Sequence, residues 1–239
     1  MKYLVPLALL ALAACAPQNG PRERGRIAPA ANPGQVIATE RAFARMAVEK
    51  GTWTAFRHYA TKDAQFPPQP GVEGSYANVH RSFKDTPDPA QPIVWGPDAA
   101  WSSCDGSFAV TTGEAAYPDG RKARFVTVWQ RQDDGEYRWV LDQGFASPGG
   151  EVSPDLIPAR VAECTKGPRP SPLARRSAMW GSGKANDGTL AWDTAIAPDC
   201  TRTATVRMAG PDGMQEVLRR VEAPPPVPSA GEPTPRCAI

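Results

Sequence analysis

Four runs of alternating apolar and polar residues fill the stretch from residue 93 to residue 144. The turns between them contain Gly106, Gly120 and Gly135, and an aspartate precedes each glycine. Alternation of this kind predicts strands with one buried face, and Asp-Gly pairs favour tight reversals between antiparallel strands. We therefore expect an antiparallel meander of four strands.

The alternation also predicts which side chains share a face of the sheet. In the third run Phe125 and Trp129 point the same way. In the fourth run Trp139 and Leu141 point the same way and Asp142 points the other way, because successive side chains alternate along a strand.

Two short helices are expected before the strands. Residues 35–50 have apolar side chains at helical spacing and end at Gly51, a residue typical of a helix end. A shorter helix follows directly, with Thr52 as its N-cap and with Trp53 and Phe56 on one face. Helices packed on one face of a curved sheet close a single core, and the concave face of such a sheet favours a pocket.

Composition limits the remaining architecture and the partners. The 239 residues include 27 Pro and 21 Gly, which disfavours long uninterrupted helices, while seven Trp supply apolar area for one modest core. The net charge of +2 provides no electrostatic footprint for nucleic acid, so we expect no nucleic-acid partner.

Proline-rich segments divide the chain. We expect a disordered tether over 16–34, a linker over 146–187 and an extended tail over 224–239. The Gly-Ser-Gly-Lys string at 181–184 lacks the first Gly and the final Ser or Thr of a phosphate-binding loop, so we interpret it as linker. Three strand-like runs predict a small β-meander over 188–223. Because three strands are marginal alone, this unit should pack on the first domain or be held by a disulfide.

The first fifteen residues predict a processed leader. Lys2 is followed by an apolar run over 4–12, which is too short to span a bilayer, and then by Leu-Ala-Ala-Cys ending at Cys15. This string resembles the lipobox of bacterial lipoproteins. The resemblance implies cleavage, a diacylglycerol and palmitate on Cys15, and a membrane partner through that anchor. Ala16 implies the periplasmic face of the outer membrane. An ordinary secretory peptide is the alternative.

Export would leave four cysteines in an oxidising compartment, where two disulfides are expected. Of the three connectivities we favour Cys104 with Cys164 and Cys200 with Cys237, because this joins each half of the chain to its own tail. No two cysteines have C-x-x-C spacing and both histidines are distant in sequence, so we expect no metal site and no cofactor.

Several strings resemble one known superfamily. They are residues 37–44 (IATERAFA), 111–113 (TTG), 125–131 (FVTVWQR) and 139–142 (WVLD). Together they resemble the SnoaL-like and ketosteroid-isomerase-like branch of the nuclear transport factor 2-like superfamily, over residues 35–145. The resemblance implies an α+β fold of cone-shaped helices packed on a curved antiparallel sheet, often a homodimer. That superfamily includes isomerases, cyclases and non-catalytic binding proteins.

This sequence lacks the catalytic residues of the family's isomerases at the matching positions. The carboxylate base of the family would fall at Pro68, and the first helix contains no tyrosine. His58, Tyr59 and Asp142 are the only substitutes that we nominate. A structural interpretation stays open for each of them. His58 could be a surface histidine, Tyr59 a core aromatic residue and Asp142 a paired structural carboxylate.

A ligand pocket would need an apolar wall. Aromatic residues could form it, although a row of aromatics on a sheet is more often core; the candidates are Phe66, Trp95, Tyr117, Phe125 and Trp129. We therefore expect a periplasm-facing, lipid-anchored protein with a non-catalytic role, either binding a small apolar molecule or acting as an envelope scaffold. The alternatives are an isomerase- or cyclase-like enzyme and a purely structural partner of envelope proteins.

Overall fold

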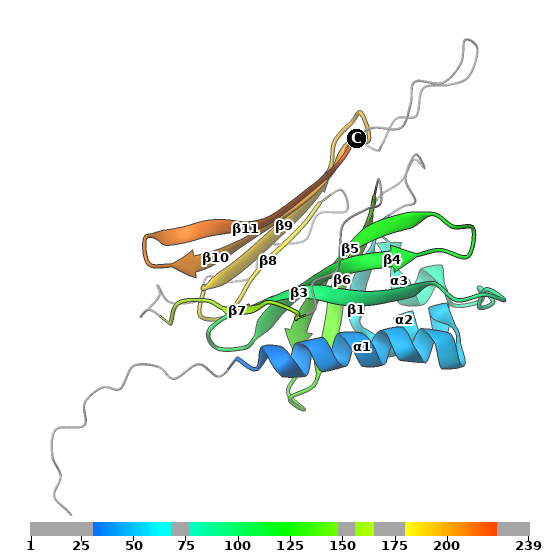
Figure 1. Cartoon of the computed structure of the whole chain (residues 1–239), viewed down its shortest axis with the longest axis horizontal. Helices are drawn as coiled ribbons and strands as arrows, with labels where there is room; N and C mark the ends of the chain where they lie inside the picture. Colours follow the sequence, from blue (N-terminus) through cyan, green and yellow to red (C-terminus); the bar gives the residue numbers. More distant parts are fainter. Residues whose placement is uncertain (1–30, 68–76, 148–155, 165–179, 224–239) are drawn as a thin grey trace, which may run out of the picture.

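The computed structural model describes residues 31–67, 77–147, 156–164 and 180–223. It is a mixed α+β structure with a large sheet, a smaller sheet and few helices (Figure 1). The helices are α1 (Pro33–Lys50), α2 (Thr52–Tyr59) and α3 (Val79–Ser82). The strands are β1 (Ala60–Phe66), β2 (Ala77–Asn78), β3 (Val94–Ser102), β4 (Phe108–Ala116), β5 (Lys122–Arg131), β6 (Tyr137–Ala146), β7 (Ala159–Val161), β8 (Trp180–Lys184), β9 (Leu190–Ile196), β10 (Arg202–Gly210) and β11 (Gly213–Glu222).

Seven strands form the larger sheet, in the order β2-β1-β6-β5-β4-β3-β7. The strands β3 to β6 are consecutive antiparallel neighbours, as the alternation predicts. Gly106, Gly120 and Gly135 all have positive φ angles in the connecting turns, a conformation that glycine adopts without steric cost. The remaining strands are not predicted by local pattern, since β1 and β7 pair in parallel with β6 and β3, which are distant in sequence.

The two helices begin and end at identifiable residues. The Asn32 side chain accepts a hydrogen bond from the Gln35 amide at 3.2 Å and caps α1, and Gly51 ends it with φ 109°. The predicted cap of α2 is wrong, because Thr52 is already helical. Asp88, from the loop before β3, accepts hydrogen bonds from the amides of the first turn of α2 instead.

A one-residue irregularity in β6 changes which side chains face the helices. Val128 of β5 pairs with Leu141, but the neighbouring Trp129 pairs with Trp139, so β6 carries one extra residue here. Because side chains alternate, a bulge moves every following residue to the other face. Trp139 lies in the helix-side core, Leu141 in the core on the opposite side, and Asp142 faces the helices. The prediction that Asp142 lies opposite to Trp139 is therefore wrong.

Both faces of the larger sheet are covered. Figure 1 shows α1 and α2 on one side and the smaller sheet, in the order β11-β10-β9-β8, on the other. Between the two sheets lies an apolar core in which Leu141 and Val128 meet Leu190 and Trp192. Complete burial of side chains of this size contributes about 1.5–3 kcal/mol each. The C-terminal strands therefore pack on the first sheet as one face of a sandwich.

The smaller sheet has one strand more than the sequence predicts. Residues 180–184, interpreted above as linker, form β8 and pair with β9. The reason lies in Trp192, whose indole ring covers β8 at Gly181 and Gly183, where a Cβ atom would approach the ring closely. Glycines in this string therefore serve close packing inside a sheet. The stretch expected as linker also contains β7.

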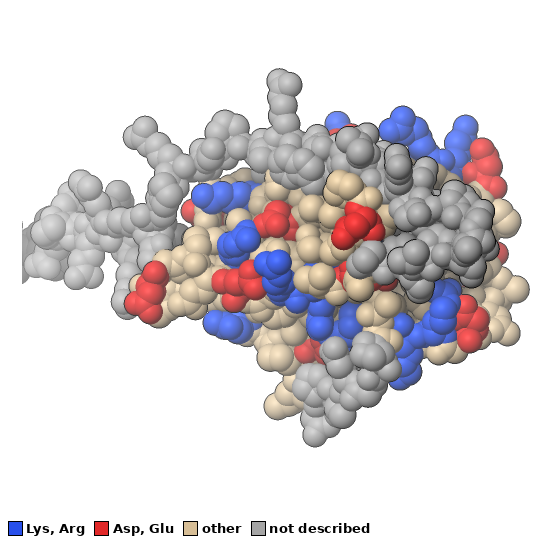
Figure 2. Space-filling view, turned by 90° about the horizontal axis from the view of Figure 1, so that it is seen from above, with Lys and Arg blue, Asp and Glu red and all other residues tan. Residues whose placement is uncertain are grey.

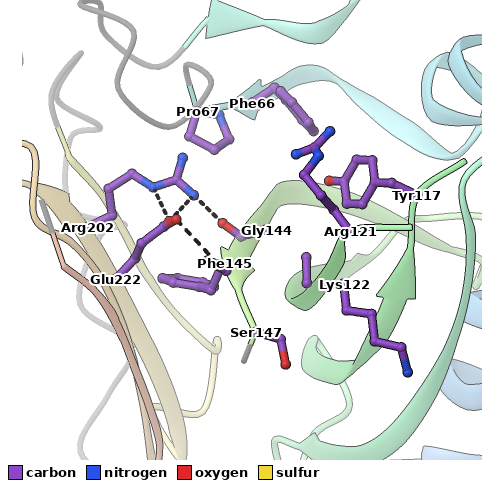
Figure 3. Close-up of a pocket in the computed structure, with 12 residues that line it drawn as sticks. Phe66, Pro67, Tyr117, Arg121, Lys122, Gly144, Phe145, Ser147, Arg202 and Glu222 are labelled. Carbon is purple, nitrogen blue, oxygen red and sulfur yellow. Dashed lines mark hydrogen bonds and ion pairs between the residues drawn. The ribbon is translucent and has the colours of Figure 1, made fainter. Parts of the chain in front are cut away.

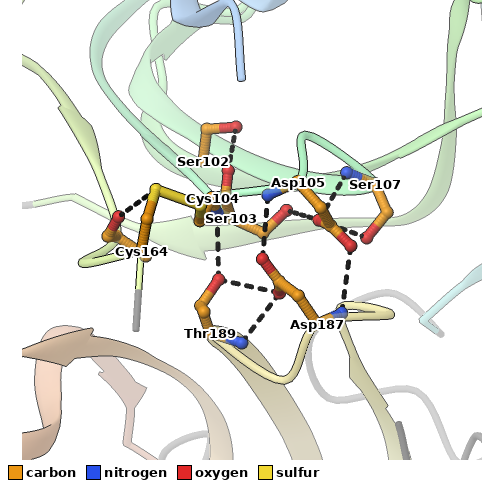
Figure 4. Close-up of a disulfide and its surroundings, with 9 residues drawn as sticks. Ser102, Ser103, Cys104, Asp105, Ser107, Cys164, Asp187 and Thr189 are labelled. Atoms are coloured by element: carbon orange, nitrogen blue, oxygen red, sulfur yellow. Dashed lines mark hydrogen bonds between the residues drawn. A yellow bond between two sulfur atoms is a disulfide. The ribbon is translucent and has the colours of Figure 1, made fainter. Parts of the chain in front are cut away.

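The β3–β4 turn is held by a disulfide within the larger sheet and by hydrogen bonds to the smaller sheet (Figure 4). The predicted disulfide between Cys104 and Cys164 is present. Cys200 is disulfide-bonded as well, but the predicted partner Cys237 lies outside the described residues. Next to the first disulfide, Asp105 and Asp187 each accept a hydrogen bond from the other's backbone amide, at 3.0 and 2.8 Å. The reciprocal pair fixes the β8–β9 turn against the β3–β4 turn.

The surface carries both signs of charge. Figure 2 shows Lys and Arg side chains interspersed with Asp and Glu across the face viewed there. Exposed ion pairs of the smaller sheet include Arg207 with Asp193 and Arg219 with Glu216. Among the described residues, no helix has the length and apolar character to cross a membrane.

Candidate functional site

A small cavity lies on the helix side of the larger sheet, which we call the inner cavity. It has a volume of about 60 Å³ and is bordered by α2, the end of β1 and the strands β3 to β6. Aromatic and small side chains dominate its wall, and Asp142 is its single charged residue; the lining consists of Trp53, Phe56, Phe66, Ile93, Trp95, Ala115, Tyr117, Ala123, Phe125, Asp142 and Gly144.

Four of the five aromatic candidates line this cavity: Phe66, Trp95, Tyr117 and Phe125. The fifth, Trp129, is fully buried below it. Its indole Nε1 donates hydrogen bonds to Thr111 Oγ1 at 2.8 Å and Glu40 Oε2 at 3.2 Å. Trp129 therefore belongs to a buried hydrogen-bonded group with Thr111 and Glu40 beneath the cavity and is not part of the cavity wall.

Asp142 provides the polar end of the inner cavity. Its side chain is only 8% exposed, and Thr127 Oγ1 donates a hydrogen bond to Oδ2 at 2.7 Å. Burial, together with the negative charge of Glu40, raises the pKa of Asp142 to about 7. At neutral pH this carboxyl group therefore exchanges readily between its protonated and ionised forms, which suits both hydrogen bonding to a ligand and proton transfer.

Glu40 is a second buried carboxyl group, and sequence reasoning missed it. It lies on the buried face of α1 and accepts hydrogen bonds from Trp95 Nε1 at 2.7 Å and Thr111 Oγ1 at 2.6 Å. Burial raises its pKa in spite of these donors. The available signal was its spacing, since Glu40 follows Val36 by four residues and precedes Phe43 by three on one helix face.

The second polar group at the inner cavity is the Tyr117 hydroxyl. Burial and the charge of Asp142 raise the pKa of Tyr117, so the phenol stays protonated and can donate a hydrogen bond. Gly144, two residues beyond Asp142, leaves room in front of it, because a Cβ at Gly144 would lie 3.8 Å from the Tyr117 Oη. An acid group and a phenol thus share one aromatic cavity.

His58 and Tyr59 lie elsewhere. They line a separate groove between α1, α2 and the β5–β6 turn, together with Glu136 and Arg138. They are absent from the wall of the inner cavity, so the structure does not bring them together with Asp142. Tyr59 packs on the helix-side core through Phe43, with their ring centroids 5.3 Å apart.

An outer chamber of about 390 Å³ adjoins the inner cavity (Figure 3). Four residues, Phe66, Tyr117, Ala123 and Gly144, line both. The far wall comes from the smaller sheet, where Arg202 of β10 pairs with Glu222 of β11 at 2.8 Å.

The Arg202 guanidinium also donates a hydrogen bond to the Gly144 carbonyl, so the smaller sheet forms part of the site. Within the described ranges no group of three His, Cys, Asp or Glu side chains could hold a metal ion.

Comparison with known proteins gives only distant similarity. The chain matches no family model, and no curated protein is significantly similar in sequence. A proposed ketosteroid isomerase from Parabacteroides distasonis is similar in structure, with 15% identity and a TM-score of 0.38, over 48% of this chain and 88% of that one. ActVI-ORFA from Streptomyces coelicolor has 15% identity and a TM-score of 0.34, over 48% of this chain and 96% of that one. At these values neither similarity says anything about activity.

Proposed function

We propose that this chain is an exported, lipid-anchored protein that binds a small apolar molecule in the cavity of a nuclear transport factor 2-like cone. One observation carries the binding proposal: an aromatic-lined cavity with a carboxyl group and a phenol at one end. Ligand sites are typically apolar with a few polar groups that fix orientation. A packed structural core would not need Asp142 with a pKa near neutrality inside such a wall.

The size of the inner cavity suggests the size of the bound group. A buried water needs roughly 10–15 Å³, so 60 Å³ corresponds to about five waters, or one six-membered ring. A ring that carries a hydroxyl or carbonyl group can form a hydrogen bond with Asp142 or Tyr117 while its faces contact Trp95 and Phe125. The rest of a larger ligand would lie in the outer chamber.

The test uses p-cresol and toluene, which differ by one hydroxyl group. We expect p-cresol to bind more tightly than toluene in ligand-observed NMR titrations of the full chain. The variant Gly144→Val should abolish binding of both, because its side chain fills the space in front of Tyr117. Gly96→Val is the matched control, since a Cβ there meets open space. Unchanged binding in folded Gly144→Val, or loss in Gly96→Val as well, would contradict the proposal.

A second candidate is an acid–base enzyme of the isomerase or cyclase type. It is favoured by Asp142, which can act as base or acid near neutral pH in a cavity shared with the Tyr117 phenol. General acid–base catalysis contributes about two to four orders of magnitude, so Asp142→Asn and Tyr117→Phe should each abolish most of any ketosteroid isomerisation. Robust turnover that these variants remove would replace the binding proposal. Turnover that survives both would exclude this cavity as its site.

The lipid anchor rests on the sequence around Cys15. Cys15→Ser should move the protein from the membrane fraction to the soluble fraction and abolish incorporation of labelled palmitate. Retention of the variant in the membrane, with no palmitate on the wild type, would exclude the anchor. The envelope scaffold, the structural-partner role and the homodimer stay predictions.

A further inference from the structure

The inner cavity and the outer chamber form one binding site with two different ends. Because Phe66, Tyr117, Ala123 and Gly144 line both spaces, a molecule longer than one ring can occupy the two together. The inner end is narrow and aromatic. The outer end is several times larger and lies between the two sheets (Figure 3).

The charges of the site are distributed unequally along this path. The inner end has Asp142 in its wall and Glu40 beneath it. The outer chamber is lined by Arg121, Lys122 and Arg202, and Glu222 is its one acidic lining residue. Glu222 pairs with Arg202, and the acidic partners of Arg121 and Lys122, Asp119 and Glu114, are not among the lining residues.

Both of these cations can exchange their partners for a ligand. Arg121 pairs with Asp119 at 2.7 Å, and the two side chains are 67% and 55% exposed. Its guanidinium also lies over the Tyr117 ring, 4.6 Å from the centroid, at the junction of the two spaces. Lys122 pairs with Glu114 at 2.8 Å and is 48% exposed. Exposed pairs of this kind are weak, because water and salt screen them.

We propose that the ligand is an amphipathic monocarboxylate, bound with its apolar end in the inner cavity and its carboxylate in the outer chamber near Arg121 and Lys122. This inference rests on the proposed function and adds the chemical class and orientation of the ligand. The reverse orientation would place the carboxylate beside Asp142 and Glu40, in a region of low dielectric where like charges repel strongly. Arginine suits this role because its planar group binds a carboxylate through two hydrogen bonds.

The experiment compares three ligands with the same apolar end: 4-phenylbutyrate, its neutral amide and 4-phenylbutylamine. Isothermal titration at pH 7 and about 20 mM NaCl keeps the Debye length long. We expect the acid to bind at least about fivefold more tightly than the amide, and the amine to bind most weakly. Raising NaCl to about 500 mM should remove most of that difference.

Two double variants test the residues involved. Arg121→Gln with Lys122→Gln should abolish the preference, so that the acid and the amide bind with similar affinity. The matched control, Arg41→Gln with Lys50→Gln, makes the same change in net charge on the exposed face of α1 and should keep the preference. Octanoate, a linear carboxylate, distinguishes a fatty acid from an aromatic acid as the natural source of this chemistry.

Two results would overturn the inference. One is an amide that binds as tightly as the acid to the wild type. The other is a preference for the acid that survives Arg121→Gln with Lys122→Gln. Failure of the proposed function looks different, since then neither p-cresol nor any member of the series would bind.

Discussion

The two faces of the larger sheet are built from the same strands but differ in chemistry. The face toward the smaller sheet is covered by packed apolar side chains, and its buried carboxylate, Asp98, is paired with Arg124. The bulge in β6 turns Asp142 to the other face. The face toward the helices contains two buried carboxyl groups, Glu40 and Asp142, and an unfilled cavity. The first arrangement contributes stability. The helix-side face contributes less to the free energy of folding, because burying a carboxyl group costs free energy and the cavity lacks packing contacts.

The largest expected effect is on the filled face. Leu190→Ala removes a completely buried side chain from the core between the sheets and should lower the free energy of unfolding by about 2–5 kcal/mol. Chemical denaturation of the full chain measures it. Leu156→Ala, at a position 84% exposed, should change stability by less than about 0.5 kcal/mol. A small effect at Leu190 would mean that the smaller sheet is not packed as described.

The next effect concerns the pH dependence of the cavity face. The pKa of Asp142 is about 7 in the folded protein and near the ordinary value of 3.8 when unfolded. Between these values the folded state holds more protons than the unfolded state, so stability falls as pH rises from about 4 to 7. Asp142→Asn should remove this loss, raising stability at pH 7 by a few kcal/mol and changing little at pH 4.

The control for this prediction is Asp119→Asn. Its carboxyl group is exposed and its pKa is lowered, so it titrates below the window from pH 4 to pH 7. Its pH profile in that window should match that of the wild type. An Asp142→Asn profile as steep as that of the wild type would show that Asp142 does not carry the pH dependence.

A smaller effect concerns how α2 is held over the cavity. Asp88 accepts hydrogen bonds from the backbone amides of Trp53 and Thr54. The Thr54 hydroxyl also donates a hydrogen bond to Asp88, at 2.6 Å. Asp88→Ala should destabilise the protein by about 1 kcal/mol, as is typical for loss of a helix cap. Hydrogen exchange should speed up mainly in α2 and not between the sheets. Uniform exchange across the molecule would argue against a local role.

The sequence predicts those parts of the fold that depend on neighbours along the chain. The glycine turns at Gly106 and Gly120 and the antiparallel order of β3 to β6 follow from local alternation. The parallel pairing of β1 with β6 brings Ala60 next to Trp139, and no local pattern predicts a contact across that distance.

The site is less predictable for a related reason. Asp142 changes face because of one extra residue in β6, and such a bulge has no signal in the alternation itself. The helical spacing places Glu40 on the apolar face of α1, but its partners, Trp95 and Thr111, are brought beside it only by folding. The predicted aromatic wall depended only on which face of each strand is apolar. The position of Asp142 depends on strand register, which the sequence alone leaves open.

The last comparison takes one glycine beside each face of the larger sheet, Gly144 in β6 and Gly183 in β8 of the smaller sheet. At Gly144 an added Cβ meets only the Tyr117 hydroxyl, at 3.8 Å, and the backbone conformation is one that alanine adopts without strain. Gly144→Ala should therefore leave stability unchanged or raise it by up to about 1 kcal/mol, because alanine restricts the unfolded chain. At Gly183 the same change places the Cβ against the Trp192 indole ring. Gly183→Ala should cost about 1–3 kcal/mol through overpacking. Thermal unfolding of the pair measures the difference directly. If Gly144→Ala is as destabilising as Gly183→Ala, the helix-side face has no unfilled space in front of Tyr117, and the contrast between the two faces of the sheet disappears.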